Sequence, residues 1–119
     1  MSQSTITITA TFADSEIAKE IEAIMNDLSL ADGMPLHEFL ESRELAKGMQ
    51  FYDSWWVPEK IKRNESVLHL QLTGSPSGYC EEEPDRDDDI VEWLRLYGVK
   101  EITGKLVIDG GGDVDVIEF

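Results

Sequence analysis

The sequence predicts an α+β fold in which two main helices cover one face of an antiparallel or mixed sheet. Three observations lead to this class. Residues 4–12 and 66–73 alternate polar with apolar side chains, two other segments carry apolar residues at helical spacing, and two short alternating segments flank a run of glycines near the end of the chain. Because the expected order is strand, helix, strands, helix, strand and strand, a ferredoxin-like arrangement is the leading topology.

The first strand and the first helix are predicted by adjacent segments. In residues 4–12 the isoleucines fall on one face and the threonines on the other, as in a half-buried strand. Asp14 then stands where a helix N-cap is expected. The apolar stripe of that helix consists of Ile17, Ile21, Ile24 and Leu28.

The middle of the chain predicts a short helix and further strands. The helix begins at Pro35 and stops near Gly48. It should bury Leu36, Phe39 and Leu40. Residues 49–57 suit either a strand or an ordered loop, and we expect Pro58 to end that segment. Residues 66–73 place three leucines on one face and predict the next strand.

A second main helix and a hairpin complete the predicted fold. The helix has the apolar stripe Ile90, Trp93, Leu94 and Tyr97, and Gly98 supplies a left-handed C-terminal stop. Residues 101–109 and 113–119 flank three consecutive glycines, which indicates a terminal β-hairpin.

Length and charge restrict the kind of protein. The 119 residues suit a single acidic α+β domain spanning residues 1–119. The 25 Asp and Glu residues against 10 Lys and Arg residues give a formal charge of −15. This charge opposes binding to nucleic-acid phosphates and to anionic membranes, and it favours a basic protein partner. Without a signal-like N-terminus or a long apolar run, we expect a cytoplasmic protein of a bacterium or a phage-infected host.

The densest negative charge lies in residues 81–92. Eight carboxylates stand there against one Arg86: Glu81, Glu82, Glu83, Asp85, Asp87, Asp88, Asp89 and Glu92. On a helix, four of them share a stripe opposite Ile90 and Leu94. The stripe suits a solvated face, a row of carboxylates that imitates nucleic-acid phosphates, or a divalent-cation site. If the stripe is exposed, neutralising it should leave the fold intact.

An aromatic segment, residues 51–56, supplies candidate anchors for a partner. In an extended segment, Trp55 and Trp56 face opposite ways, so both cannot easily enter the core. Exposed Trp and Tyr are common at interface hot spots, which makes Tyr52, Trp55 and Trp56 candidate partner-binding residues. The alternative is that both indole rings close over a sheet edge.

No residue pattern predicts catalysis or a bound cofactor. His37 and His69 have no companions at metal-ligand spacing, and residues 109–115 lack the spacing of a calcium loop. Cys80 is the single cysteine and stands beside acids that disfavour its thiolate. We therefore expect no enzyme activity, no metal and no cofactor.

In size and charge the chain is similar to phage anti-restriction and anti-CRISPR proteins and to bacterial toxin-immunity proteins. The resemblance implies a non-enzymatic inhibitor that occupies the basic, nucleic-acid-binding surface of a partner, and it assigns no residue roles. One alternative is an immunity protein or antitoxin that neutralises a basic nuclease. An alternative of another class is a small enzyme or a divalent-cation-binding protein that uses the Asp and Glu clusters.

Overall fold

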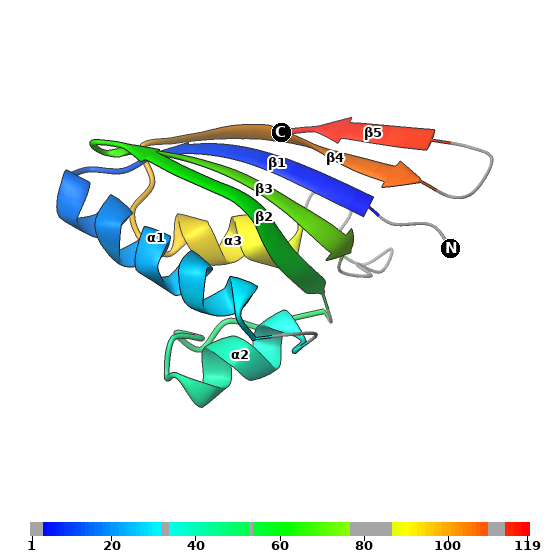
Figure 1. Ribbon diagram of the computed structural model, residues 1–119, viewed down its shortest axis with the longest axis horizontal. Coiled ribbons are helices and arrows are strands. Elements are labelled where there is room, and N and C mark those ends of the chain that lie inside the picture. The colour runs from blue at the N-terminus through cyan, green and yellow to red at the C-terminus, as the bar shows by residue number, and fades with distance from the viewer. Residues whose placement is uncertain (1–3, 32–33, 53, 77–86, 110–113) are drawn as a thin grey trace.

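A five-stranded antiparallel sheet with three helices on one side makes up the computed structural model (Figure 1). The structure describes residues 4–31, 34–52, 54–76, 87–109 and 114–119. The strands are β1 (Ser4–Thr11), β2 (Trp55–Asn64), β3 (Val67–Ser75), β4 (Glu101–Asp109) and β5 (Val114–Glu118). The helices are α1 (Ser15–Ser29), α2 (Leu36–Ser42) and α3 (Asp89–Arg95).

The α+β prediction is confirmed. The strand order is β2-β3-β1-β4-β5, and every neighbouring pair is antiparallel. From β1 to β4 the chain follows the β-α-β-β-α-β order of the ferredoxin-like motif, with α2 inserted after α1 and β5 added beyond β4.

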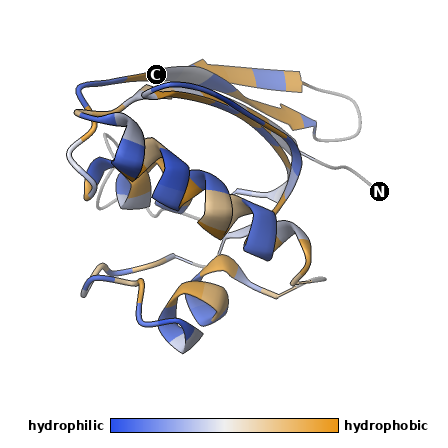
Figure 2. Ribbon diagram, turned by 60° about the vertical axis from the view of Figure 1, so that its left-hand side comes forward, coloured by the Kyte–Doolittle hydropathy of each residue, from blue (hydrophilic) through white to orange (hydrophobic). Residues whose placement is uncertain are grey.

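The alternation predicted for the first strand determines which face of the sheet is covered. Ile6, Ile8 and Ala10 of β1 are fully buried beneath the helices. In the register with β3 they stand opposite Leu72, Leu70 and Leu68, which are also buried. The threonines of β1 lie on the other face, which none of the described helices covers (Figure 1). The two faces of the central strand thus separate core from surface. Figure 2 shows the helices gathered on one side of the curved sheet.

The predicted helices form with their apolar stripes inward. Asp14 caps α1 by accepting a hydrogen bond from the Ile17 amide at 3.0 Å. The predicted stripe of α2 is buried, but the helix ends at Ser42, before Gly48. In α3, Ile90, Trp93 and Leu94 are buried. The predicted C-terminal hairpin is confirmed as β4 and β5, and its turn at residues 110–113 lies outside the described residues.

The expectation that Pro58 ends the aromatic segment is wrong. Strand β2 begins at Trp55 and continues through Pro58 to Asn64. Proline has no amide proton for a ladder, but β2 is an edge strand, and its register with β3 shifts between Pro58 and Lys60. An edge position beside a bulge is where a strand tolerates proline.

Candidate interaction surface

The acidic run falls into two parts in the structure. Residues 81–83 and 85 lie outside the described residues, so the placement of Glu81, Glu82, Glu83 and Asp85 as partner-binding residues stays a prediction. The described carboxylates of the run lie at the start of α3 and along it. They are Asp87, Asp88, Asp89 and Glu92.

Asp88 is a buried N-cap. Its side chain accepts a hydrogen bond from the Ile90 amide at 3.2 Å, which satisfies one of the free amides in the first turn of α3. The same carboxylate oxygen accepts a hydrogen bond from Nε1 of Trp56 at 2.8 Å. Only 3% of Asp88 is exposed. The Asp88 carboxylate therefore links the start of α3 to strand β2 by hydrogen bonds.

Asp89 is fully buried, and it ties α3 to the aromatic segment. Its Oδ2 accepts hydrogen bonds from the Tyr52 amide at 2.9 Å and from the Ser54 hydroxyl at 3.3 Å. The expectation that Asp88 and Asp89 belong to an exposed stripe is wrong. Asp88 satisfies an amide in the first turn of α3, and Asp89 satisfies two donors of the aromatic segment, so both acids serve the fold inside the protein.

The other two described carboxylates of the run share one arginine. Nη2 of Arg95 lies 2.6 Å from Oδ2 of Asp87, and Nη1 lies 3.0 Å from Oε2 of Glu92. Both carboxylates are partly buried. Arg95 offsets one of the two negative charges, so this part of the run keeps one net negative charge on partly buried groups.

The aromatic residues face opposite ways, as their adjacency in a strand requires. Trp56 points into the core and is 1% exposed, so the expectation that it serves as an exposed anchor is wrong. Trp55 lies on the helix-free face and is half-buried. Tyr52 is also half-buried. Trp55 and Tyr52 stay candidate anchors.

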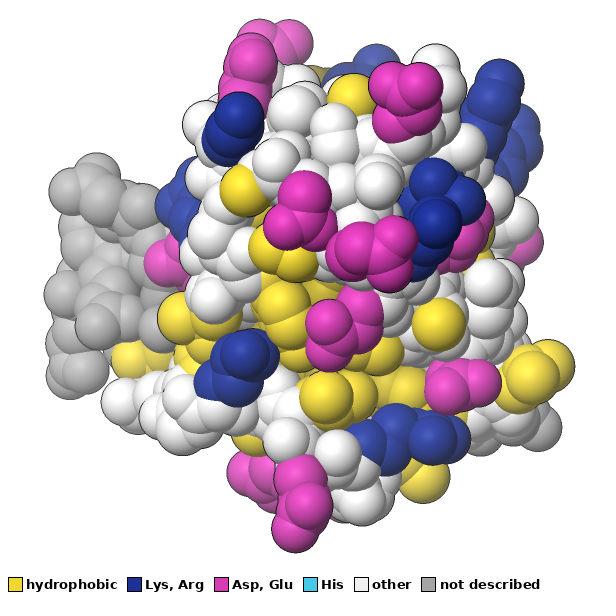
Figure 3. Space-filling view, turned by 90° about the vertical axis from the view of Figure 1, so that its left-hand side faces the viewer, with side chains coloured by type: hydrophobic (Ala, Val, Ile, Leu, Met, Phe, Trp, Pro, Cys, Tyr) yellow, Lys and Arg dark blue, Asp and Glu magenta, His cyan; other side chains and the backbone are white. Residues whose placement is uncertain are grey.

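About half of the carboxylates that the described residues expose, seven of thirteen, lie around α1 and α2. Seven carboxylates in this part of the chain are exposed: Asp14, Glu16, Glu20, Asp27, Glu38, Glu41 and Glu44. The described bases among residues 14–44 are Lys19 and Arg43, which pair with Glu16 and Asp27 at 3.4 and 3.8 Å. On the side where α1 begins, acidic side chains are interspersed with basic and apolar ones (Figure 3).

An exposed apolar pair lies at the connection between α1 and α2. Leu30, the C-cap residue of α1, is 81% exposed, and Met34 is 38% exposed. Sequence analysis missed this pair, because both residues follow the periodic stripe of the helix and no pattern marks them. Carboxylates of both helices flank the pair in the sequence, as the rim of a protein-binding patch would.

The helix-free face of the sheet has a different mix of charges. Lys60 and Lys62 of β2 and Lys105 of β4 lie on it with the threonines of β1. Arg63, which follows Lys62, turns to the helix side and pairs with Glu22 of α1 at 3.0 Å. Exposed Glu101 and Asp109 of β4 and Glu118 of β5 share this face, so the sheet face carries both signs of charge.

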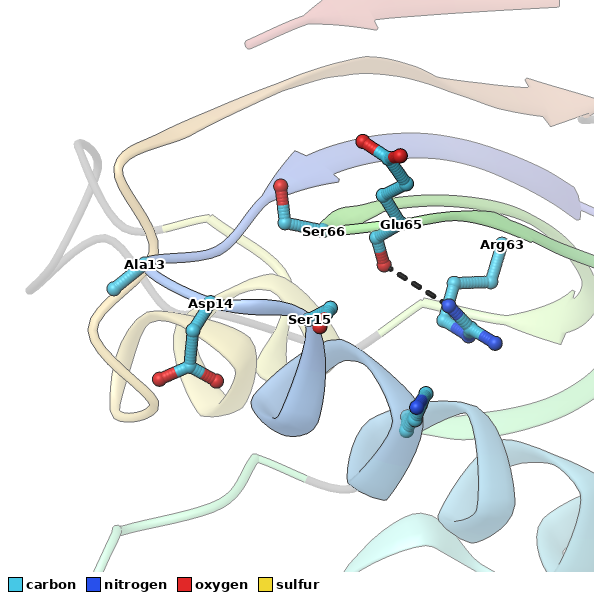
Figure 4. A pocket seen from close by; sticks show the side chains of 7 residues that line it. Ala13, Asp14, Ser15, Arg63, Glu65 and Ser66 are labelled. Atoms are coloured by element: carbon cyan, nitrogen blue, oxygen red, sulfur yellow. Dashed lines mark hydrogen bonds between the residues drawn. The ribbon is translucent and has the colours of Figure 1, made fainter.

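A hollow of about 570 Å³ opens between the start of α1 and the β2–β3 hairpin (Figure 4). Three of its charged side chains, Arg63, Lys19 and Asp14, have partners: Arg63 donates to the Glu65 carbonyl at 3.1 Å, Lys19 pairs with Glu16, and Asp14 caps α1. Within the described chain, nothing in this hollow forms a nucleophile–base pair, so it supports no catalytic assignment.

Metal-binding groups do not converge within the described parts of the chain, where no cluster of three His, Cys, Asp or Glu residues could hold an ion. His69 lies on the exposed sheet face, as predicted, with Nδ1 at 3.2 Å from the Thr9 hydroxyl. None of the helices that the structure describes has the length and apolar character needed to span a bilayer. Comparison of the chain with protein-family models, curated proteins and solved structures found no match in any of the three.

Proposed function

We propose that this protein is a non-enzymatic, acidic binding protein of the cytoplasm that occupies a basic, nucleic-acid-binding surface of a partner protein. The observation that carries the proposal is the row of exposed carboxylates on α1 and α2, which has few bases to compensate it. This helix layer takes the place of the described carboxylates of the acidic run, at residues 87–92, which are bound to groups of the protein itself.

The helix layer combines the two features that a protein interface needs. Its carboxylates attract a basic surface from a distance, which raises association rates by a factor of about 10 to 10³ at low salt. Leu30 and Met34 supply apolar surface that becomes buried only in a complex, and such contacts mainly slow dissociation. If the partner is a basic nuclease toxin, the protein would act as an immunity protein that uses the same acidic surface.

A pair of charge-matched variants tests the proposal. The helix variant carries Glu16→Gln, Glu20→Gln, Glu38→Gln and Glu41→Gln. The control variant removes the same charge from exposed positions elsewhere, by Glu59→Gln, Glu65→Gln, Glu101→Gln and Glu118→Gln. A partner captured by crosslinking in the native cell is purified, and its association rate with each variant is measured at several salt concentrations.

We expect the helix variant to associate more slowly than the control, with a difference that shrinks as salt screens the charges. The wild-type protein should also displace nucleic acid from the partner and show no affinity of its own for duplex DNA in a gel shift. Equal association rates for the two variants, or a partner that binds nucleic acid and this protein together, would contradict the proposal.

A further inference from the structure

The two edges of the sheet differ in how well they are protected from pairing with another strand. The β2 edge carries Pro58, a register shift between Pro58 and Lys60, and two exposed lysines. Proline, bulges and lysines are features with which proteins prevent edge-to-edge association. The β5 edge has no proline, no bulge and no lysine among its described residues, and every residue from Val114 to Glu118 is exposed.

Strand β5 carries exposed apolar side chains on both of its faces, beside one acid on each, Glu118 and Asp115. Val114 and Val116 are 60% and 55% exposed on the helix-free face, and Ile117 is 40% exposed on the other. Val116 stands directly opposite Val107 of β4, so the apolar surface continues one strand inward. An exposed, apolar edge strand with free backbone groups is a template for adding a further strand.

The backbone of β5 shows which groups are free to pair. Phe119, just after the strand, exchanges both backbone hydrogen bonds with Gly104 of β4, at 3.1 and 3.2 Å. Because backbone direction alternates along an antiparallel strand, Ile117 and Asp115 also point toward β4. The amides and carbonyls of Val114, Val116 and Glu118 therefore point toward the open edge.

We propose that β5 is a self-association edge, where two copies of this chain pair antiparallel about a two-fold axis at Val116. This axis is the middle of the strand, so all five residues pair. Val116 faces its own copy, Val114 faces Glu118, and Asp115 faces Ile117. The three residues with outward backbone groups then bond to one another, and the two sheets join into one.

The charges and the outward backbone groups of the strand together favour this register. An axis at Ile117 would also keep acids apart, but it would leave Val114 without a partner. An axis at Asp115 or at Glu118 would place a carboxylate opposite its own copy, which destabilises a strand pair. With the axis at Val116, no acid faces an acid, and Lys105 stands across from Glu118 within each copy. The axis also brings Val107 and Val116 of both copies together on the helix-free face. Because each copy carries −15, association should strengthen as salt rises.

Sedimentation of the full chain over a wide concentration range, at low and high salt, measures the dimer. We expect a monomer–dimer equilibrium that shifts toward the dimer with salt, and concentration-dependent protection of the Val114, Val116 and Glu118 amides from hydrogen exchange. V116K should weaken the dimer by about tenfold or more, because it sets two lysines directly opposite each other. The control T103K adds the same charge at an exposed position of β4 that has no residue of β5 opposite it.

A mixture of variants tests the two-fold axis itself. V116K and V116E should each be monomeric, and mixing them should restore pairing as a heterodimer, because Lys then faces Glu. A wild-type chain that is monomeric at all concentrations and salts would overturn the proposal. A dimer that V116K leaves unchanged, or one whose three amides exchange freely, would also overturn it, since the contact would then lie elsewhere.

Discussion

Asp89 shows how a single acidic residue can serve the fold instead of the surface. Its carboxylate is fully buried and accepts hydrogen bonds from a backbone amide and a hydroxyl. Removing it leaves the partly buried Tyr52 amide and the buried Ser54 hydroxyl without this acceptor. Each buried donor that loses its acceptor costs about 1–3 kcal/mol.

We therefore expect Asp89→Ala to lower the free energy of unfolding by about 2–4 kcal/mol, measured by urea denaturation. The matched control is Glu92→Gln on the same helix, which loses only a partly exposed ion pair with Arg95 and should cost less than about 1 kcal/mol. Equal effects for the two variants would show that the Asp89 hydrogen bonds contribute nothing. If the acids of α3 formed an exposed stripe, neutralising them would leave the stability of the fold unchanged. The buried hydrogen bonds of Asp89 predict a loss of stability instead.

Tyr97 gives a prediction about pH. Burial, and then the negative charge of Glu20, raise the pKa of its phenol above the usual value of 10.0. Its hydroxyl oxygen is buried and has no hydrogen-bond partner within the described chain. The folded state therefore disfavours the phenolate. Between the unfolded pKa of 10.0 and the higher folded pKa, the unfolded chain releases this proton first, so stability falls as pH rises.

Tyr97→Phe removes the titrating group and keeps the ring that packs edge-on against Trp93. At neutral pH we expect its unfolding free energy to equal that of the wild type within about 1 kcal/mol, or to exceed it, because no hydrogen bond is lost. Above pH 10 the variant should become the more stable of the two. Denaturation curves of both proteins at neutral and alkaline pH check this. If the difference between their unfolding free energies is the same at both pH values, the pKa of Tyr97 is not raised in the folded protein.

At the scale of elements, the contact between β1 and β4 depends on a missing side chain. Gly104 pairs with Ile8 in the register, and a Cβ atom there would overlap the Thr7 carbonyl and crowd the Phe119 ring. A backbone carbonyl within a ladder cannot easily move aside. Glycine at this point allows the two strands to approach.

Gly104→Ala should accordingly lower the unfolding free energy by about 2–3 kcal/mol, the range of overpacked sites. Thr103→Ala, at the exposed neighbouring position, is the control and should change it by less than about 1 kcal/mol. Thermal unfolding of both variants compares them directly. A stable Gly104→Ala protein would mean that β4 can shift along β1 at little cost.

At the scale of the whole molecule, the charge of −15 opposes the compact state. Because salt screens repulsion between exposed carboxylates, the melting temperature should rise by a few degrees between low and physiological ionic strength. The helix variant, with four fewer charges on α1 and α2, should show a smaller rise. A melting temperature that does not change with salt would mean that the carboxylates repel one another as strongly in the unfolded chain as in the folded protein.

Local patterns in the sequence predicted most of the elements because each depends on neighbouring residues. Alternation in residues 4–12 and 66–73 has the period of a strand, and the isoleucines of α1 have the period of a helix. Asp14 caps α1 through the amide of a residue three positions away. The surplus of carboxylates and the absence of a catalytic pattern likewise follow from composition and spacing alone.

The roles of the acidic run and the aromatic segment depended on contacts between distant parts of the chain. Thirty-seven positions separate Tyr52 from Asp89, and thirty-two separate Trp56 from Asp88. A periodic pattern says which residues share a face, but not whether another segment covers that face. Folding places β2 beside the start of α3, where burying the tryptophan requires an acceptor for its N–H. Only this packing decided that two of the eight carboxylates belong to the core.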